Sequence, residues 1–239
     1  MQERLGMALT INTNLSSMIV QKNLNSATTG LNSAIEKMTT GYRINHAKDD
    51  AAGYSIATSW ATKISSLDVA SENASMGLDL LKTAEENYSL ITEHLQRVRD
   101  LTEQAANGTY GADSKAAIKA EITARLTEID RISANAEFNG IPLMNGAGTA
   151  KTLQVGIDKT ANSKITLDAT LFAAATTAKL FATGGTDAKL EDVATACTGN
   201  AAADQLEKID AAISNVSTRV TTIGAVQNRV ESAISSISV

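Results

Sequence analysis

The densest group of side chains that could do chemistry follows Gly41 in the first quarter of the chain and comprises His46, Lys48, Asp49 and Asp50. An imidazole beside two carboxylates is suited to acid–base catalysis or to metal binding. The same segment is bounded by Gly41 and Gly53, which punctuate helical patterns. We therefore interpret it as a structured connector whose charges form salt bridges, with a catalytic or metal role as the alternative.

The other reactive side chains are isolated. Cys197 is the one cysteine, so no intrachain disulfide can form, and we interpret it as an unreactive thiol in a loop rich in Ala and Thr. A redox or intermolecular role is the alternative. His46 and His94 are too few for a zinc site. The sequence contains no Gly-rich phosphate loop and no GxSxG, HExxH or CxxC motif. We expect no catalytic, cofactor-binding or metal-binding residues, and no enzyme activity.

The composition limits both the core and the partners. Hydrophobic residues make up 43% of the 239 residues, but aromatic residues only 3%, so a core must use small aliphatic side chains that let helices lie close together. The net charge of −5 argues against a nucleic-acid partner. No run of 18 apolar residues is present, so we expect no membrane insertion. The N-terminus shows no cleavable signal peptide, which leaves export through an uncleaved N-terminus open.

Two long heptad patterns must position these side chains. The first contains Trp60, Leu67, Ala74, Leu81, Tyr88 and Leu95, beside Ala70, Gly77, Ala84, Ile91, Val98 and Ala105. The second contains Leu206, Ile213, Val220 and Ile234, interrupted at Gln227, beside Ile209, Val216, Ile223, Val230 and Ile237. Such spacing indicates helices that bury a narrow seam against another helix. We expect both to pack antiparallel, with Trp60 and Tyr88 in the core rather than stacked on a ligand.

The remaining patterns complete a mainly α fold, a long antiparallel helical bundle or coiled-coil rod with a small β-hairpin region. Apolar periodicity predicts helices at about 11–38, 55–106, 114–136 and from about 203 to the end of the chain. The second of these would be roughly 75 Å long. Alternating apolar residues around 153–157 and 165–171 predict the hairpin. Residues 173–203 are read as a loop with a short helix near 190–196.

A cluster of charged side chains crowds the polar face near the end of the long predicted helix. Its members are Gln96, Arg97, Arg99, Asp100 and Glu103, with Leu101 among them. Glu121 lies on the next helix, which we expect to fold back alongside. From the residues alone, the simplest interpretation is a solvated helix face of mixed charge.

Several motifs resemble those of bacterial flagellin. They are MALTINTN at 7–14, GYRIN at 41–45, AKDDAAG at 47–53, LQRVRDL at 95–101, QAANGT at 104–109, EI at 121–122, EIDRI at 128–132, FNG at 138–140 and VQNRVE at 226–231. Together they extend over about residues 7–145 and the last helix. The resemblance implies a short form that lacks the usual C-terminal end.

The resemblance also implies a domain organisation. Residues 1–6 are a prefix outside the family pattern, 7–40 an N-terminal helix of the inner filament tube, and 41–54 a spoke connector. Residues 55–146 form the N-terminal helices of a rod domain. The β-hairpin and Ala/Thr-rich loop occupy 147–202, and the truncated C-terminal rod helix occupies 203–239.

By the same resemblance, the function is that of a structural subunit of the flagellar filament, used in motility. The implied partners are other flagellin subunits in a helical homopolymer and the flagellar export apparatus, and the implied location is secreted and extracellular. In many flagellins an arginine, a leucine and a glutamate contact Toll-like receptor 5, and the matching positions are Arg97, Leu101 and Glu121. The alternatives are a hook–filament junction protein and a non-polymerising receptor-binding or adhesive fragment.

The end of the chain inside its heptad pattern gives one further expectation. Flagellins continue to a C-terminal apolar helix that pairs with the N-terminal one, so the seam of helix 11–38 would lack its usual intrachain cover. We expect this chain alone not to form normal filaments, and long native-like filaments in electron micrographs of the purified chain would refute that.

Overall fold

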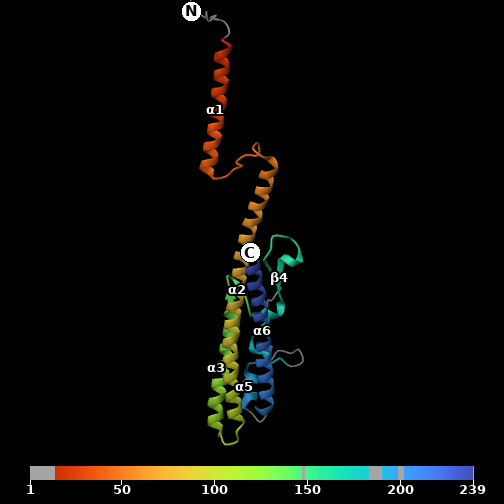
Figure 1. Cartoon of the computed structure of the whole chain (residues 1–239). Coiled ribbons are helices and arrows are strands. Elements are labelled where there is room, and N and C mark those ends of the chain that lie inside the picture. Colours follow the sequence, from red (N-terminus) through yellow and green to blue (C-terminus); the bar gives the residue numbers. More distant parts are fainter. Residues whose placement is uncertain (1–13, 147–148, 183–189, 199–201, 239) are drawn as a thin grey trace, which may run out of the picture. The chain divides into compact units, whose positions relative to one another are not determined.

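The computed structural model describes residues 14–146, 149–182, 190–198 and 202–238. Its helices are α1 (Leu15–Thr40), α2 (Ala51–Ala106), α3 (Ala112–Asn135), α4 (Thr177–Leu180), α5 (Leu190–Thr198) and α6 (Ala202–Ile237) (Figure 1). Its strands are β1 (Glu137–Phe138), β2 (Ile141–Pro142), β3 (Lys151–Gln154) and β4 (Lys164–Leu167), with 3₁₀ turns at Ala161–Ser163 and Ala169–Phe172. The mainly α fold with a small β region is confirmed.

The chain divides into two compact units, residues 1–63 and 64–239. In the first unit, Asn14 caps α1, because its Oδ1 accepts a hydrogen bond from the Ser17 amide at 3.1 Å. Gly41 ends the helix with φ of 74°, a left-handed conformation that glycine adopts without steric cost. Its amide donates to the Lys37 carbonyl at 3.0 Å.

The charged side chains of the connector after α1 make two kinds of contact. The side chains of His46 and Glu36 are within hydrogen-bond distance, with 2.7 Å between Nε2 and Oε1. Asp49 Oδ2 instead accepts the amides of Asn45 and His46. Desolvation would raise the pKa of the Asp49 carboxyl, but these amides and the charges of two lysines outweigh it and lower that pKa. The connector is present, but the expectation that its charges form salt bridges is wrong for its carboxylates: within the described residues, Asp49 and Asp50 accept backbone amides and form no ion pair.

Asp50 begins the longest helix. Its Oδ1 accepts the Gly53 amide at 2.9 Å, which satisfies one of the free amides in the first turn of α2. The helix therefore begins at Ala51 rather than near Ser55, and it ends at Ala106 as the sequence indicates.

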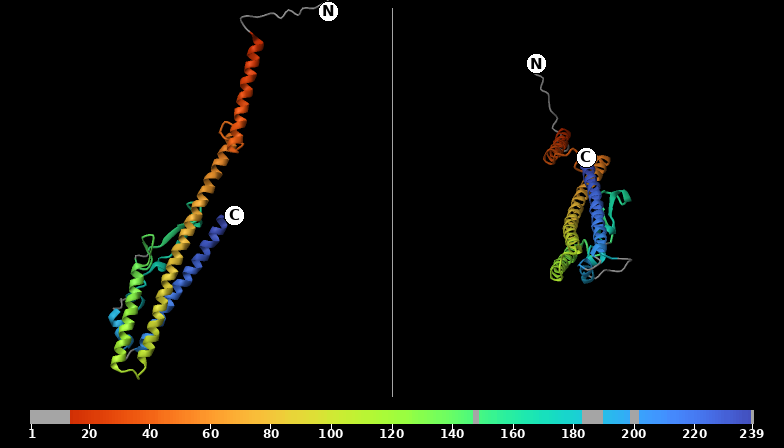
Figure 2. Two further views of the ribbon diagram at one scale, coloured as in Figure 1. Left: turned by 90° about the vertical axis from the view of Figure 1, so that its left-hand side faces the viewer. Right: turned by 90° about the horizontal axis from the view of Figure 1, so that it is seen from below.

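In the second unit, paired side chains define how the helices run. Arg97 of α2 contacts Glu121 of α3, and His94 of α2 contacts Arg125 of α3. Residue numbers therefore rise along one helix as they fall along the other. Arg99 and Glu85 of α2 pair in the same way with Asp210 and Gln227 of α6. Both α3 and α6 are therefore antiparallel to α2 and lie beside it (Figures 1 and 2). The predicted antiparallel pairing of the two heptad helices is confirmed.

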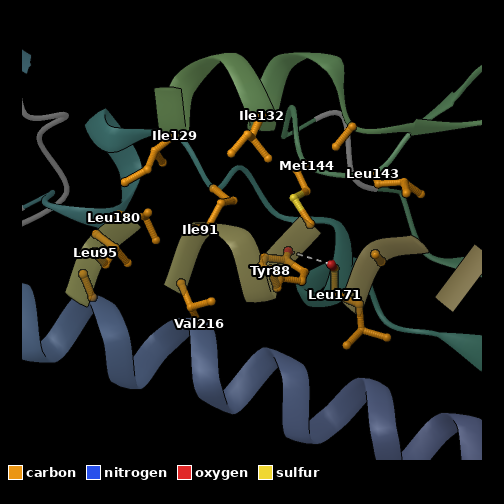
Figure 3. Packing of buried hydrophobic residues seen from close by; sticks show 14 of the residues in the cluster. Tyr88, Ile91, Leu95, Ile129, Ile132, Leu143, Met144, Leu171, Leu180 and Val216 are labelled. Atoms are coloured by element: carbon orange, nitrogen blue, oxygen red, sulfur yellow. Dashed lines mark hydrogen bonds between the residues drawn. The ribbon is translucent and has the colours of Figure 1, made fainter. Parts of the chain in front are cut away.

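The heptad rows form the core of this unit. In α2 the buried residues are Ala70, Ala74, Gly77, Leu80, Leu81, Ala84, Tyr88, Ile91, Leu95, Val98, Leu101, Thr102 and Ala105. From α6, Ile209, Val216, Ile223 and Val230 are completely buried. From α3, Ile122, Leu126 and Ile129 join them. Figure 3 shows Ile129 and Ile132 facing Ile91 and Leu95 across the core, with Val216 on the α6 side.

Two antiparallel strand pairs pack beside the helices. β3 and β4 pair with Leu153 opposite Ile165, which confirms the predicted hairpin. β1 and β2 form a second, very short pair that the sequence reading missed, because the turn signals there hid the two-residue strands. Their turn is Asn139-Gly140, with φ of 49° and 74°, the left-handed pair of conformations that suits a two-residue hairpin turn.

Two residues lie elsewhere than predicted. Trp60 is 62% exposed, with the Lys63 ammonium 5.7 Å from the centre of its ring, so it is not a core residue. Burial along α2 begins only at Ala70, and a heptad pattern does not reveal how much of a helix is covered. Cys197 is not in a loop, because it belongs to α5 and is completely buried.

Candidate functional site

The three residues singled out from the sequence fall at the packing of α2 against α3. The Arg97 guanidinium lies 2.9 Å from Glu121 Oε1, and its Nε donates to the same oxygen at 3.0 Å. Arg125, one turn along α3, lies 3.9 Å from that oxygen. The Arg97 and Glu121 side chains are 47% and 38% exposed, so the pair is available to a partner.

Leu101 differs from the other two, because it is 2% exposed. It lies one helical turn beyond Arg97 on α2, and its side chain packs in the core with the neighbouring heptad positions. The structure thus brings Arg97 and Glu121 together on the surface and places Leu101 beneath it. The sequence pattern could not show whether Leu101 lies on the surface or in the core, because α2 has apolar residues on more than one face.

The charged cluster around Arg97 divides between two sides of α2. Arg99 points away from α3 and donates from Nε to Asp210 Oδ1 of α6 at 2.7 Å, with Glu103 at 3.4 Å from its NH1. The hydrogen bond and charge of Asp210 raise the pKa of Arg99. The cluster is therefore more than a solvated face, because its two arginines link α2 to α3 and to α6. These pairs are exposed, so each contributes little stability.

A buried polar contact that the sequence reading missed joins three segments. The Tyr88 hydroxyl donates to the Leu171 carbonyl at 2.9 Å (Figure 3). Arg219 of α6 donates from NH1 to the Ala173 carbonyl at 2.9 Å and lies 3.4 Å from the Tyr88 oxygen. Its guanidinium is 5.8 Å from the centre of the Tyr88 ring, within reach of a cation–π attraction. In the sequence, the one indication of this contact was a tyrosine in a heptad row made mainly of aliphatic residues.

Gln227, which interrupts the last heptad row, has a partner. Its Nε2 donates to Glu85 Oε2 of α2 at 2.8 Å, and both side chains are half-buried. A single polar residue on a helix seam favours the one register in which it finds its partner, at some cost in stability. The interruption is therefore a cross-helix contact that specifies how α6 aligns with α2.

The apolar face of α1 is uncovered. No residue of this helix is buried. Its large apolar side chains are between 51% and 85% exposed, and they are Leu15, Met18, Ile19, Val20, Leu24, Leu31, Ile35 and Met38. Val20, Leu24, Leu31, Ile35 and Met38 recur at helical spacing on one side of α1, and this row is the apolar face of the helix. Monomeric soluble proteins rarely expose a contiguous apolar surface, so this row marks an association face.

Other kinds of site are not in evidence within the described residues. No three His, Cys, Asp or Glu side chains gather in a way that could hold a metal ion there. None of the described helices is both long enough and apolar enough to cross a membrane.

Comparison with known proteins identifies the family. Residues 11–149 match the model of the bacterial flagellin N-terminal helical region. A B-type flagellin of Pseudomonas aeruginosa is 43% identical over 69% of this chain, and flagellins of Salmonella muenchen and Xenorhabdus nematophila are 45% and 44% identical over 68% and 63%. The chain spans 33%, 31% and 48% of the lengths of these relatives.

Solved structures agree at the level of fold. The crystal structure of Bacillus cereus flagellin matches 70% of this chain and 88% of its own, with a TM-score of 0.55 and 27% identity. A flagellar hook-associated protein from Vibrio parahaemolyticus matches 81% of this chain and 94% of its own, with a TM-score of 0.66, but at 18% identity it shows the shared fold alone. Because the family model matches more than half of its residues, the chain belongs to the bacterial flagellin family.

Proposed function

We propose that the chain is a structural subunit of the bacterial flagellar filament, used in motility. The observation that carries the proposal is the uncovered apolar face of α1, in a chain of the flagellin family. Burying one Leu or Ile side chain contributes about 1.5–3 kcal/mol, so covering several of them on another copy gives a strong drive to associate. Head-to-tail contacts of one chain with the next generate an open filament when the rotation between copies does not close into a ring.

The association face can be tested by adding one charge to it. Leu31→Asp places a carboxylate on the apolar face, where Leu31 is 60% exposed. Thr29→Asp adds the same side chain on the side of α1 opposite Leu31, outside the row of Val20, Leu24, Leu31, Ile35 and Met38, and serves as the matched control. Sedimentation velocity should show concentration-dependent association of the unchanged chain and of Thr29→Asp, but not of Leu31→Asp. Electron microscopy then reports whether the associated material is fibrous. An unchanged chain that stays monomeric at every concentration would contradict the proposal.

The location follows from the same proposal. A filament subunit must leave the cell, and we propose export through the flagellar secretion system to the extracellular filament. Its support is the family membership. Cells that carry this chain should release it into the medium, and cells that lack a functional flagellar export apparatus should retain it. Equal release from both would contradict the export route.

A second candidate function is binding to Toll-like receptor 5 through Arg97 and Glu121, with Leu101 holding the face from beneath. The specific observation in its favour is the half-exposed ion pair of Arg97 and Glu121 across two adjacent helices. A planar guanidinium beside a carboxylate offers paired donors and acceptors to a protein partner.

The receptor test uses only the exposed pair. Arg97→Ala together with Glu121→Ala should raise the half-maximal signalling concentration in receptor reporter cells about tenfold, equivalent to ~1.4 kcal/mol of binding free energy. Arg131→Ala is the control, because Arg131 is exposed on the same helix and pairs only with its neighbour Glu128 in the described structure. Leu101→Ala is unsuitable alone, since a cavity in the core costs about 2–5 kcal/mol. Unchanged signalling by the double variant would refute the proposal.

A further inference from the structure

Three Asn-Gly pairs occur in the chain, and the proposed function uses none of them. They are Asn107-Gly108, Asn139-Gly140 and Asn145-Gly146. An asparagine followed by glycine can react with its own backbone, because no Cβ hinders the approach of the glycine amide nitrogen to the side-chain carbon. The structure places the three pairs in different surroundings, so they should differ in reactivity.

Asn107 lies in the exposed turn between α2 and α3 (Figure 1). Its Oδ1 accepts two hydrogen bonds from Thr109, one from the backbone amide at 3.1 Å and one from the hydroxyl at 3.0 Å. Attack on Asn107 Cγ would build negative charge on this oxygen. Two donors already directed at an atom that becomes negative stabilise the transition state, as the donors of an oxyanion hole do.

Gly108 is free to act as the nucleophile. Among the described residues, none accepts a hydrogen bond from its backbone amide. A Cβ added at Gly108 would meet nothing within 4 Å, so the turn has room around this residue. The nitrogen can therefore approach the side chain without first giving up a contact that holds the fold.

The other two pairs are held in place. Asn139 and Gly140 form the turn between paired strands, with Phe138 opposite Ile141, and both have φ fixed in the left-handed region. Gly146 also has positive φ, at 80°, and lies against Ala174, whose Cβ would be 3.1 Å from an added Cβ. Ring closure at either pair requires the backbone to leave these conformations, which costs free energy before any reaction begins.

We propose that Asn107 is a site of spontaneous deamidation in the folded protein, promoted by Thr109. The Gly108 amide nitrogen bonds to Asn107 Cγ and loses its hydrogen, the bond from Cγ to Nδ2 breaks, and Nδ2 leaves as ammonia with that hydrogen. The product is a five-membered succinimide. Water then adds to one of its two carbonyl carbons and opens the ring to aspartate or to isoaspartate, with no oxidant or reductant involved.

The modification puts a carboxylate one residue beyond the end of α2. The carbonyl end of a helix carries partial negative charge, so a second negative group there is unfavourable. The isoaspartate product also adds a carbon to the backbone of the turn. Deamidation therefore gives this turn a change that accumulates with the age of the molecule.

The test is peptide mapping by mass spectrometry of the full chain incubated in mildly alkaline buffer, folded and in urea. Conversion replaces an amide by a carboxyl and is read as a mass increase at each Asn-Gly peptide. In urea all three pairs should convert. In the folded chain Asn107 should convert clearly faster than Asn139 and Asn145. Conversion of either of these at the rate of Asn107, or no conversion at Asn107, would overturn the proposal.

Three substitutions in the exposed turn test the roles of the Thr109 donors and of the Gly108 nitrogen. Thr109→Val keeps the shape but removes the hydroxyl, and the folded-state rate at Asn107 should fall about fivefold, the factor that one exposed hydrogen bond contributes. Thr109→Ser keeps the hydroxyl and should react like the unchanged chain. Gly108→Ala, which the turn can accommodate, should nearly abolish conversion. A Thr109→Val chain that reacts as fast as the unchanged one would refute the assigned promotion by Thr109.

Discussion

Tyr88 shows how a single side chain organises a core that is otherwise aliphatic. Its ring fills a heptad position between α2 and the neighbouring helices, while its hydroxyl reaches the Leu171 carbonyl. Arg219 of α6 donates a hydrogen bond to the Tyr88 oxygen. Burial raises the pKa of the Tyr88 phenol, and the hydrogen bond and charge of Arg219 offset part of that rise. The phenol thus stays protonated and keeps its role as a donor.

Replacing Tyr88 by Phe removes the hydroxyl donor and should lower the free energy of unfolding. The ring still packs, but the buried Leu171 carbonyl loses its partner, so we expect the free energy of unfolding to fall by about 1–3 kcal/mol. Urea denaturation followed by circular dichroism measures the change. Tyr42→Phe is the matched control, because Tyr42 is 71% exposed and the same substitution there should change stability by less than about 0.5 kcal/mol. Equal effects at both positions would argue against the buried contact.

Cys197 predicts a specific dependence of stability on pH. Burial raises the pKa of its thiol, and a hydrogen bond with Thr102 and the charge of Lys208 offset part of the rise. A raised folded-state pKa gives stability that is complete below the ordinary thiol pKa and is lost as pH rises from that value to the folded one. Unfolding in urea at increasing alkaline pH should therefore show a decline that Cys197→Ala reduces. A decline of the same slope in both chains would contradict this assignment.

Among the helices, Gly77 sets how closely the β3–β4 hairpin approaches α2. It is buried on the heptad row, and a Cβ at this position would overlap the Leu153 side chain of β3. Glycine inside a helix normally lowers stability relative to alanine. The close contact explains the glycine, because a side chain at this position would displace Leu153 from its present conformation.

Alanine at Gly77 and at Gly224 should have different effects. Gly224 lies inside α6 with nothing within 4 Å of an added Cβ, so Gly224→Ala should stabilise the chain by about 1 kcal/mol through helix propensity. Gly77→Ala gains the same propensity but must displace Leu153, an overpacking that costs about 1–3 kcal/mol. Thermal unfolding measures both. Identical stabilisation by the two substitutions would show that the hairpin does not pack as described.

Sequence patterns predicted the elements better than the contacts between them. The rows through Ile91 and Val216 recur at heptad spacing, so the helices and their buried faces could be read directly. The length over which the helices pair could not be predicted, because Trp60 continues the heptad pattern but is exposed. For the candidate site, Arg97 and Glu121 were placed correctly on adjacent helices, whereas the burial of Leu101 depends on tertiary packing. The partner of Gln227 likewise depends on a residue 142 positions away.

At the scale of the whole molecule, the two units differ in what holds them folded. Residues 64–239 contain the buried core, whereas α1 buries none of its residues. Most of the stability of a protein helix comes from tertiary packing, and a helix rich in Asn, Ser and Thr is a poor former on its own. Its apolar face therefore supplies little stability to a single copy and becomes useful only when another surface covers it.

Limited proteolysis of the dilute chain should reveal this difference. We expect the first cuts within residues 15–40, because transient opening of α1 costs little, and later cuts within α2 beyond Ala70, α3 and α6. Mass spectrometry of the fragments identifies the sites. Raising the protein concentration should slow the first cuts if association covers α1. Early cleavage inside α3 instead would contradict the assigned order of stability.

From the antiparallel pairing of α2 with α6 we also expect an order of events in folding. Arg97 and Glu121, which join α2 to α3, are 24 residues apart, but Arg99 and Asp210 are 111 apart and Glu85 and Gln227 are 142 apart. Closing long loops is entropically costly and makes non-local contacts form slowly. We therefore expect the α2–α3 hairpin to assemble first and the core to be completed only when α6 packs against it. Until that last helix docks, one side of the α2 seam faces water.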